Sequence, residues 1–171
     1  MAKKTANEKL LYAGDLPKVA DQSDRPGFVE RYGGTLLYIA APMQYHEIMA
    51  AIPEGQLTTV DRVRAYLAKH ADADLTCPLT AGIFTNVAAH ASEERESGAQ
   101  DSAAAQVGAP IAWWRTLKTD GELNPKYPGA FDEQVARLKS EGHEVVQKGK
   151  RWFVVNYEGA LVDLDALLTR Y

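Results

Sequence analysis

The order of periodic segments along the chain constrains its fold most strongly. Apolar residues recur at helical spacing in 60–67, 79–95 and 131–140, which predicts three main amphipathic helices. Two β-prone runs follow, 143–147 and 152–157, on either side of a glycine-containing basic turn, which predicts a hairpin. Three helices followed by a hairpin with a basic tip form the outline of a winged helix-turn-helix. We therefore expect an α+β, winged helix-turn-helix-like fold.

The remaining segments suggest how the chain is organised around these helices. We expect an N-terminal arm with a short strand over 1–42, a main helical domain over 43–142, and a hairpin and tail packed on it over 143–171. Further local expectations are a strand at 35–40, a helix at 43–51, a loop at 98–109 and a short helix or turn at 163–171. Within 79–95, the expected buried stripe consists of Ile83, Phe84, Val87, Ala88 and Ala91.

Composition narrows the class of protein. A chain of 171 residues with 46% hydrophobic and 25% charged residues predicts one globular domain. The single cysteine excludes an internal disulfide. We find no signal peptide and no apolar run long enough to span a membrane, so we expect a cytoplasmic protein without membrane contact. The formal net charge of −4 argues mildly against nucleic acid, because phosphate-binding domains usually carry a basic excess.

Two motifs in the middle of the chain are more informative. The first is IPEGQLTT, from Ile52 to Thr59, and the second is WWRTLKTDGEL, from Trp113 to Leu123. The second continues into Tyr-Pro-Gly-Ala at 127–130 and a Glu-Gly pair at 141–142. Together these motifs resemble the DNA-binding domain of the alkylguanine-DNA alkyltransferases over residues 43–142. In that family the first motif leads into a helix-turn-helix, and the second contains the active-site sequence Pro-Cys-His-Arg-Val.

The departures from the family pattern bear on the function. Trp113 falls where the family keeps its nucleophilic cysteine, and Trp114 falls at its histidine. Without a thiolate, alkyl transfer has no acceptor. A tryptophan at this position is similar to the alkyltransferase-like proteins, which bind alkylated guanine in DNA without removing the alkyl group and hand the lesion to excision repair. The resemblance thus implies a non-enzymatic protein with no catalytic residue and no cofactor.

Further departures affect the expected contacts with DNA. Val60 falls at the family's phosphate-rotating tyrosine. The region of the recognition helix, 77–86, has no arginine, so the finger that fills the gap left by a flipped base is missing. Ala112 replaces a proline, and the segment 92–110 is longer than the family pattern.

The resemblance implies a pocket for an altered or flipped base. Its expected residues are Trp113, Trp114, Arg115 and Tyr127. Stacking of a base on an aromatic ring is worth about 1–3 kcal/mol. For Arg115 the resemblance implies a role in ordering the active-site loop, and the alternative is a surface ion pair. For the aromatic residues the alternative is two core or half-exposed tryptophans and a turn tyrosine.

A second set of residues is expected to contact the DNA backbone. It comprises Thr58, Thr59, Arg62 and Arg64 around a helix start, and Lys148, Lys150 and Arg151 at the hairpin tip. The alternatives are a capped, solvated helix and a soluble turn.

Cys77 lies ahead of Pro78 at an expected helix start, with His70 and His90 on either side in the sequence. A helix N-terminus or a nearby base can activate a thiol. A single cysteine with scattered histidines is nevertheless typical of an inert buried thiol, and these three residues lack the spacing of a zinc site. We expect no metal site, and an enzyme using Cys77 is a third hypothesis.

The leading hypothesis is a monomeric alkyltransferase-like protein that binds double-stranded DNA, including alkylated guanine, and signals to a repair protein. The alternative is a winged-helix scaffold that has lost DNA recognition and mediates protein–protein interaction. The missing tyrosine, the missing arginine finger and the acidic balance favour this alternative. A salt series separates the two, since binding through several phosphates weakens steeply with salt.

Overall fold

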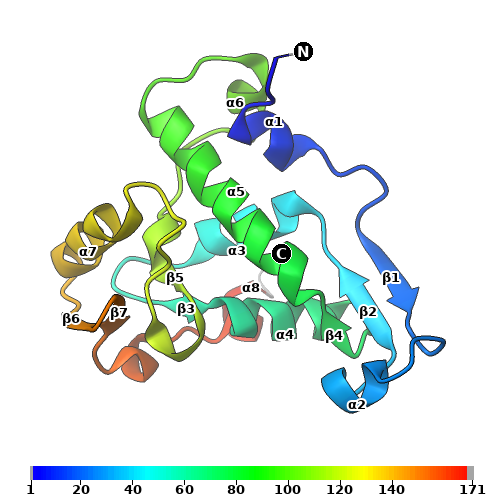
Figure 1. Cartoon of the computed structure of the whole chain (residues 1–171). Helices are drawn as coiled ribbons and strands as arrows, with labels where there is room; N and C mark the ends of the chain where they lie inside the picture. Colours follow the sequence, from blue (N-terminus) through cyan, green and yellow to red (C-terminus); the bar gives the residue numbers. More distant parts are fainter. Residues whose placement is uncertain (1, 169–171) are drawn as a thin grey trace.

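The computed structural model describes residues 2–168; Met1 and residues 169–171, the end of the expected tail, lie outside the described residues. The described chain is a mixed α+β fold with eight α-helices and three small sheets (Figure 1). The helices are α1 (Ala6–Leu11), α2 (Phe28–Tyr32), α3 (Pro42–Ala51), α4 (Val60–His70), α5 (Pro78–Glu96), α6 (Ser102–Val107), α7 (Ala130–Ser140) and α8 (Leu164–Leu168). The strands are β1 (Lys18–Asp21), β2 (Leu36–Ile39), β3 (Thr58–Thr59), β4 (Leu75–Thr76), β5 (Thr116–Leu117), β6 (Val145–Lys148) and β7 (Arg151–Val154).

Helix α5 runs diagonally through the middle of the fold, in contact with α1, α3, α4 and α6 (Figure 1). Pro78 occupies its first turn, where the missing N–H costs no helical hydrogen bond. Its buried side is made mostly of small residues, namely Ala81, Thr85, Ala88, Ala89, Ala91 and Ser92. Small side chains allow neighbouring helices to approach closely. The prediction that Ile83 belongs to the buried stripe is wrong, because its side chain faces away from this packed side and is 48% exposed.

The N-terminal residues are more structured than the arm expected from their composition. β1 pairs with β2 in antiparallel fashion, and β2 pairs with β4 in parallel. The expected strand at 35–40 is therefore confirmed as β2, in the middle of a three-stranded sheet. Leu10 of α1 is fully buried in the core with Tyr45 and Met49 of α3. Residues 1–42 thus contribute core and sheet as well as surface.

The prediction of a loop over 98–109 is wrong for Ser102–Val107, which form α6. Its alanine-rich sequence has high helix propensity. The side chain of Asp101 caps the helix by accepting a hydrogen bond from the N–H of Ala104 at 2.8 Å. Ala103 and Ala104 are buried, and α6 packs on α1 and α5.

The predicted C-terminal hairpin is confirmed. β6 and β7 pair in antiparallel register from Val145↔Val154 to Lys148↔Arg151, and Gly149 in the turn adopts a positive φ of 64°. The three predicted main helices correspond to α4, α5 and α7. A second core lies between α7 and the hairpin and contains Leu57, Leu117, Leu123, Leu138, Val145 and Val154.

None of the helices in the described part of the chain is long and apolar enough to cross a membrane.

Candidate nucleic-acid interface

The Trp-Trp-Arg motif forms a single 3₁₀ turn, Trp113–Arg115, between α6 and β5. The structure brings the predicted pocket aromatics together: the Trp113 ring lies 5.5 Å from that of Tyr127 and 5.7 Å from that of Trp114, both edge-on. Trp113 is fully buried and Tyr127 is 2% exposed. Their rings fill the core, so a base can stack on either only if neighbouring side chains move.

Trp114 is the accessible member of this cluster. The guanidinium groups of Arg137 and Arg115 lie over its ring at 4.7 and 5.6 Å from the centroid. Trp114 also lines a hollow of about 580 Å³ together with His46, Pro110 and the same two arginines.

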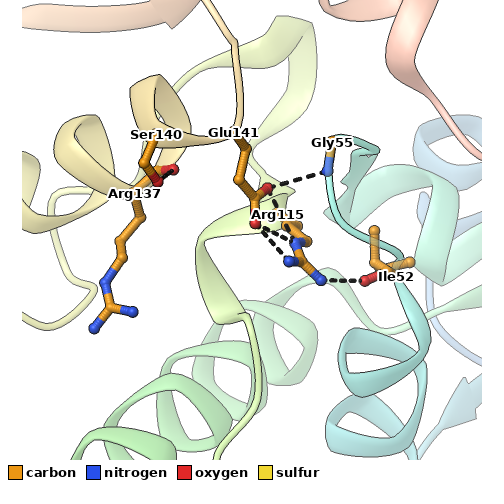
Figure 2. A network of polar contacts seen from close by, with 6 residues as sticks. All are labelled: Ile52, Gly55, Arg115, Arg137, Ser140 and Glu141. Atoms are coloured by element: carbon orange, nitrogen blue, oxygen red, sulfur yellow. Dashed lines mark hydrogen bonds and ion pairs between the residues drawn. The ribbon is translucent and has the colours of Figure 1, made fainter.

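Arg115 connects the two sequence motifs (Figure 2). Its Nε donates to the carboxylate of Glu141 at 2.9 Å, and its Nη1 donates to the carbonyl of Ile52 at 2.7 Å. The N–H of Gly55 donates to the same carboxylate at 3.3 Å. The two side chains are only 15% and 5% exposed. The pair thus holds the motif at 113–123 against the motif at 52–59 and the end of α7.

This network also controls the charge of the carboxylate. Burial alone would raise the pKa of Glu141, but the hydrogen bond from Arg115, together with smaller effects that include the N–H of Gly55, outweighs burial and lowers the pKa below its ordinary value. Glu141 is therefore the ionised partner of a part-buried pair.

Thr58 and Thr59, predicted as backbone contacts, lie inside the fold. They form β3, which pairs in parallel with Thr116 and Leu117 of β5. Thr58 is fully buried and Thr59 is 2% exposed. Their side chains are thus not on the surface that could meet a phosphate.

The cationic residues of the predicted contact set lie on the surface, but not all are free. Arg62 is exposed and Arg64 half-buried, and neither guanidinium makes an ion pair with any described residue. Lys148 and Lys150 are exposed at the hairpin tip. Arg151 donates from Nε and Nη2 to Glu122 at 2.9 and 2.8 Å. The hydrogen bond from Arg151 lowers the pKa of Glu122 against the opposing effect of burial.

A groove of about 500 Å³ brings several of these elements together. We call it the α4–α5 groove. It is lined by the start of α4, the first half of α5, the segment 118–126 and Arg151; its residues are Val60, Asp61, Arg64, Pro78, Leu79, Gly82, Ile83, Thr85, Asn86, Lys118, Thr119, Asp120, Glu122, Asn124, Pro125, Lys126 and Arg151. The buried hydroxyl of Tyr127 lies next to two of the lining residues, Thr85 and Asn124.

Sequence reasoning missed Leu79, Ile83 and Asn86 as members of this surface. Helical spacing could have placed them on one face of α5, but only the packed structure shows that this face is uncovered.

Cys77 and its two neighbouring histidines are separated in the structure. Cys77 is half-buried just ahead of α5, and its N–H donates to the carbonyl of Tyr38 in β2. His70 bonds to Asp165 at 2.8 Å, and His90 bonds to the carbonyl of Lys126 at 2.7 Å. Among residues 2–168, no group of three or more His, Cys, Asp or Glu side chains is arranged to hold a metal ion.

No protein-family model matches the sequence. A search of curated proteins finds no match either. Two solved structures are similar in fold. One is a crystal structure of S. pombe Atl1 in complex with damaged DNA containing O6-carboxymethylguanine, at 14% identity and a TM-score of 0.44. The other is S. pombe ATL in complex with DNA, at 15% identity and a TM-score of 0.46. Each comparison covers 71% of this chain and 94% of the other chain.

Proposed function

We propose that this chain is a non-enzymatic, alkyltransferase-like protein that binds double-stranded DNA as a monomer and recognises alkylated or flipped guanine. The α4–α5 groove carries the proposal: it adjoins the motif at 113–123, and it combines an exposed apolar helix face with Arg64 and Lys126. Groove-binding proteins use this combination, in which cations position the backbone and apolar side chains approach the bases.

The absence of a thiol from the motif supports recognition over alkyl transfer. Trp113 occupies the position of the family's nucleophile and is buried, with no thiol beside it in the motif. Cys77 is the residue directly ahead of α5, and its backbone N–H donates to the carbonyl of Tyr38 in β2. A protein of this kind would hold the lesion and present it to a repair protein.

The surface cations supply the proposed backbone contacts. Arg62 and Arg64 on α4, and Lys148 and Lys150 on the hairpin, would contact phosphates, with β6 and β7 acting as the wing. Thr58 and Thr59 directly precede α4, and the backbone N–H groups in the first turn of that helix would bind a phosphate. Arg151 would join them only by exchanging Glu122 for a phosphate.

Fluorescence anisotropy with two labelled duplexes tests the proposal. One duplex carries a single O6-methylguanine and the other carries guanine at the same position. We expect tighter binding of the first duplex. For four phosphate contacts, we expect log Kd to rise with log salt with a slope of about 3–4. Arg64→Gln and Lys148→Gln should each reduce that slope by about one.

Lys139→Gln is the matched control, because Lys139 is exposed on α7 and outside the groove. Absence of binding to both duplexes at low salt would contradict the proposal. Equal binding to both would leave DNA binding but remove lesion recognition.

One observation favours the alternative, a scaffold for protein–protein interaction. The same groove includes Asp61, Asp120 and Glu122, and the apolar face of α5 would also suit a protein partner. Such a contact would respond weakly to salt, so the same titration distinguishes the two functions.

A further inference from the structure

The first half of α5 presents three side chains in a row along the groove. Leu79, Ile83 and Asn86 follow the spacing i, i+4, i+7, which places them on one helix face. Leu79 is 72% exposed and Ile83 is 48% exposed. Leu79 is the most exposed large hydrophobic residue of the part of the chain that the structure describes. We call these three residues the α5 stripe.

The hydrogen bonds around Asn86 determine how its amide is oriented. The backbone N–H of Lys126 donates to Oδ1 of Asn124 at 2.9 Å, so the other side of that amide is its NH₂ group. This NH₂ group donates to Oδ1 of Asn86, also at 2.9 Å. The NH₂ group of Asn86 is then left without a partner among the described residues and lines the groove. The apolar part of the stripe therefore ends at an available hydrogen-bond donor.

The groove that contains the stripe carries a small excess of positive charge, with four cations against three carboxylates. Four cationic side chains line the groove, and Arg64 and Lys126 make no ion pair with described residues. Of the three carboxylates in the lining, Glu122 is paired with Arg151 and Lys118, while Asp61 and Asp120 make no ion pair with a described residue. The cations that remain unpaired lie on α4 and on the segment 124–127, which flank the stripe.

Resting on the DNA-binding function proposed above, we infer that Leu79 and Ile83 form an apolar wedge that enters between adjacent base pairs of duplex DNA. At the opened step, the Asn86 NH₂ group donates to an acceptor on a base edge. Leucine and isoleucine are among the side chains that proteins insert between base steps, and the insertion partly unstacks them. Base edges offer oxygen and nitrogen acceptors in both grooves, to which an amide NH₂ is complementary.

Duplexes that carry 2-aminopurine at single positions test the wedge, because the fluorescence of this base rises when it is unstacked. The wild-type protein should raise the fluorescence at the bound step. Leu79→Ala and Ile83→Ala should abolish most of that rise, and Leu79→Ala should weaken binding about tenfold because less apolar surface is buried against the bases. Val29→Ala is the matched control, since Val29 is 45% exposed on α2 and lies outside the groove.

Comparing Asn86→Asp with Gln106→Glu tests whether the NH₂ group of Asn86 donates to the DNA. Both substitutions convert an exposed or half-buried amide into a carboxylate and add the same charge, but Gln106 lies on α6. We expect Asn86→Asp to weaken duplex binding at least about fivefold more than Gln106→Glu does. Both add one negative charge, but only Asn86→Asp removes the donor that would meet the base edge. Circular dichroism and thermal unfolding confirm that each variant is folded.

The outcomes separate the wedge from the function on which it rests. If the wild-type protein binds duplex without a rise in 2-aminopurine fluorescence, and Leu79→Ala binds equally well, the wedge is wrong and DNA binding stands. If Asn86→Asp behaves like Gln106→Glu, the assignment of the donor is wrong. If the wild-type protein binds no duplex at low salt, both the wedge and the proposed function are wrong.

Discussion

Arg115 shows how much of this fold depends on a single side chain. It joins segments at 52–55, 113–117 and 140–141 that are distant in sequence, through hydrogen bonds to Ile52 and Glu141 (Figure 2). Arg115→Met should lower the free energy of unfolding by about 3–4 kcal/mol, because it leaves a 5% exposed carboxylate without its partner. Urea denaturation at pH 7 measures this change.

Arg62→Met is the control, because it makes the same substitution at an exposed arginine with no ion pair among described residues. It should change the free energy of unfolding by less than about 0.5 kcal/mol. Equal effects of the two substitutions would mean that the Arg115–Glu141 pair contributes no special stability.

At the scale of elements, the docking of α1 on α5 depends on a polar contact inside the core. Asn7 is fully buried; its Nδ2 donates to the carbonyl of Ala91, and its Oδ1 accepts from Arg95 at 2.7 Å. The carboxylate of Glu94 accepts hydrogen bonds from the N–H groups of Ala6 and Asn7, where the helix dipole favours a negative charge.

Asn7→Ala should therefore release α1 before the rest of the fold opens. We expect the free energy of unfolding to fall by about 2–3 kcal/mol, because Arg95 loses a buried acceptor. In hydrogen exchange, the amides of α1 should exchange faster while those of α7 stay unchanged. Gln106→Ala, which alters an exposed amide on α6, should leave both helices protected. Uniform acceleration throughout the chain would contradict this local role.

At the scale of the whole molecule, stability should depend on pH through a histidine in the core. His46 is 7% exposed, and Nη2 of Arg95 donates to its Nε2 at 3.3 Å. Burial, followed by the charge of Arg95, lowers the pKa of His46 to about 4. In the unfolded chain the pKa is near 6.5, so between these values the unfolded state binds more protons than the folded state.

The free energy of unfolding should consequently fall as the pH drops from 7 towards 4. The contribution of His46 is fully present above pH 6.5. Further loss should begin below about pH 4.5, because the glutamate of the unfolded chain then takes up a proton more readily than Glu141 does in the fold. Urea denaturation at pH 7, 6 and 5 measures the upper part of this window. His46→Gln should flatten the dependence between pH 7 and 5, and an unchanged slope would contradict the assignment.

The net charge of the whole molecule does not show which charged groups are paired in the fold. The acidic residues Glu93, Glu94 and Glu96 contribute to the net charge of −4, yet two of them are engaged by other parts of the fold. Glu94 holds the start of α1, and Glu96 pairs with Arg137. Contacts between distant segments thus pair or hydrogen-bond some carboxylates, while the cationic groups of Arg62, Arg64 and Lys126 make no ion pair with a described residue.

The sequence by itself determined the main helices and the C-terminal hairpin, because periodicity and turn residues are local properties. Only the tertiary structure decided which faces are covered. Trp113 and Tyr127 are buried, whereas Leu79 and Ile83 are exposed, because α1 and α3 from the N-terminal part of the chain pack on one side of α5 and leave the face with Leu79 and Ile83 uncovered. Burial depends on such long-range packing, which no local pattern encodes.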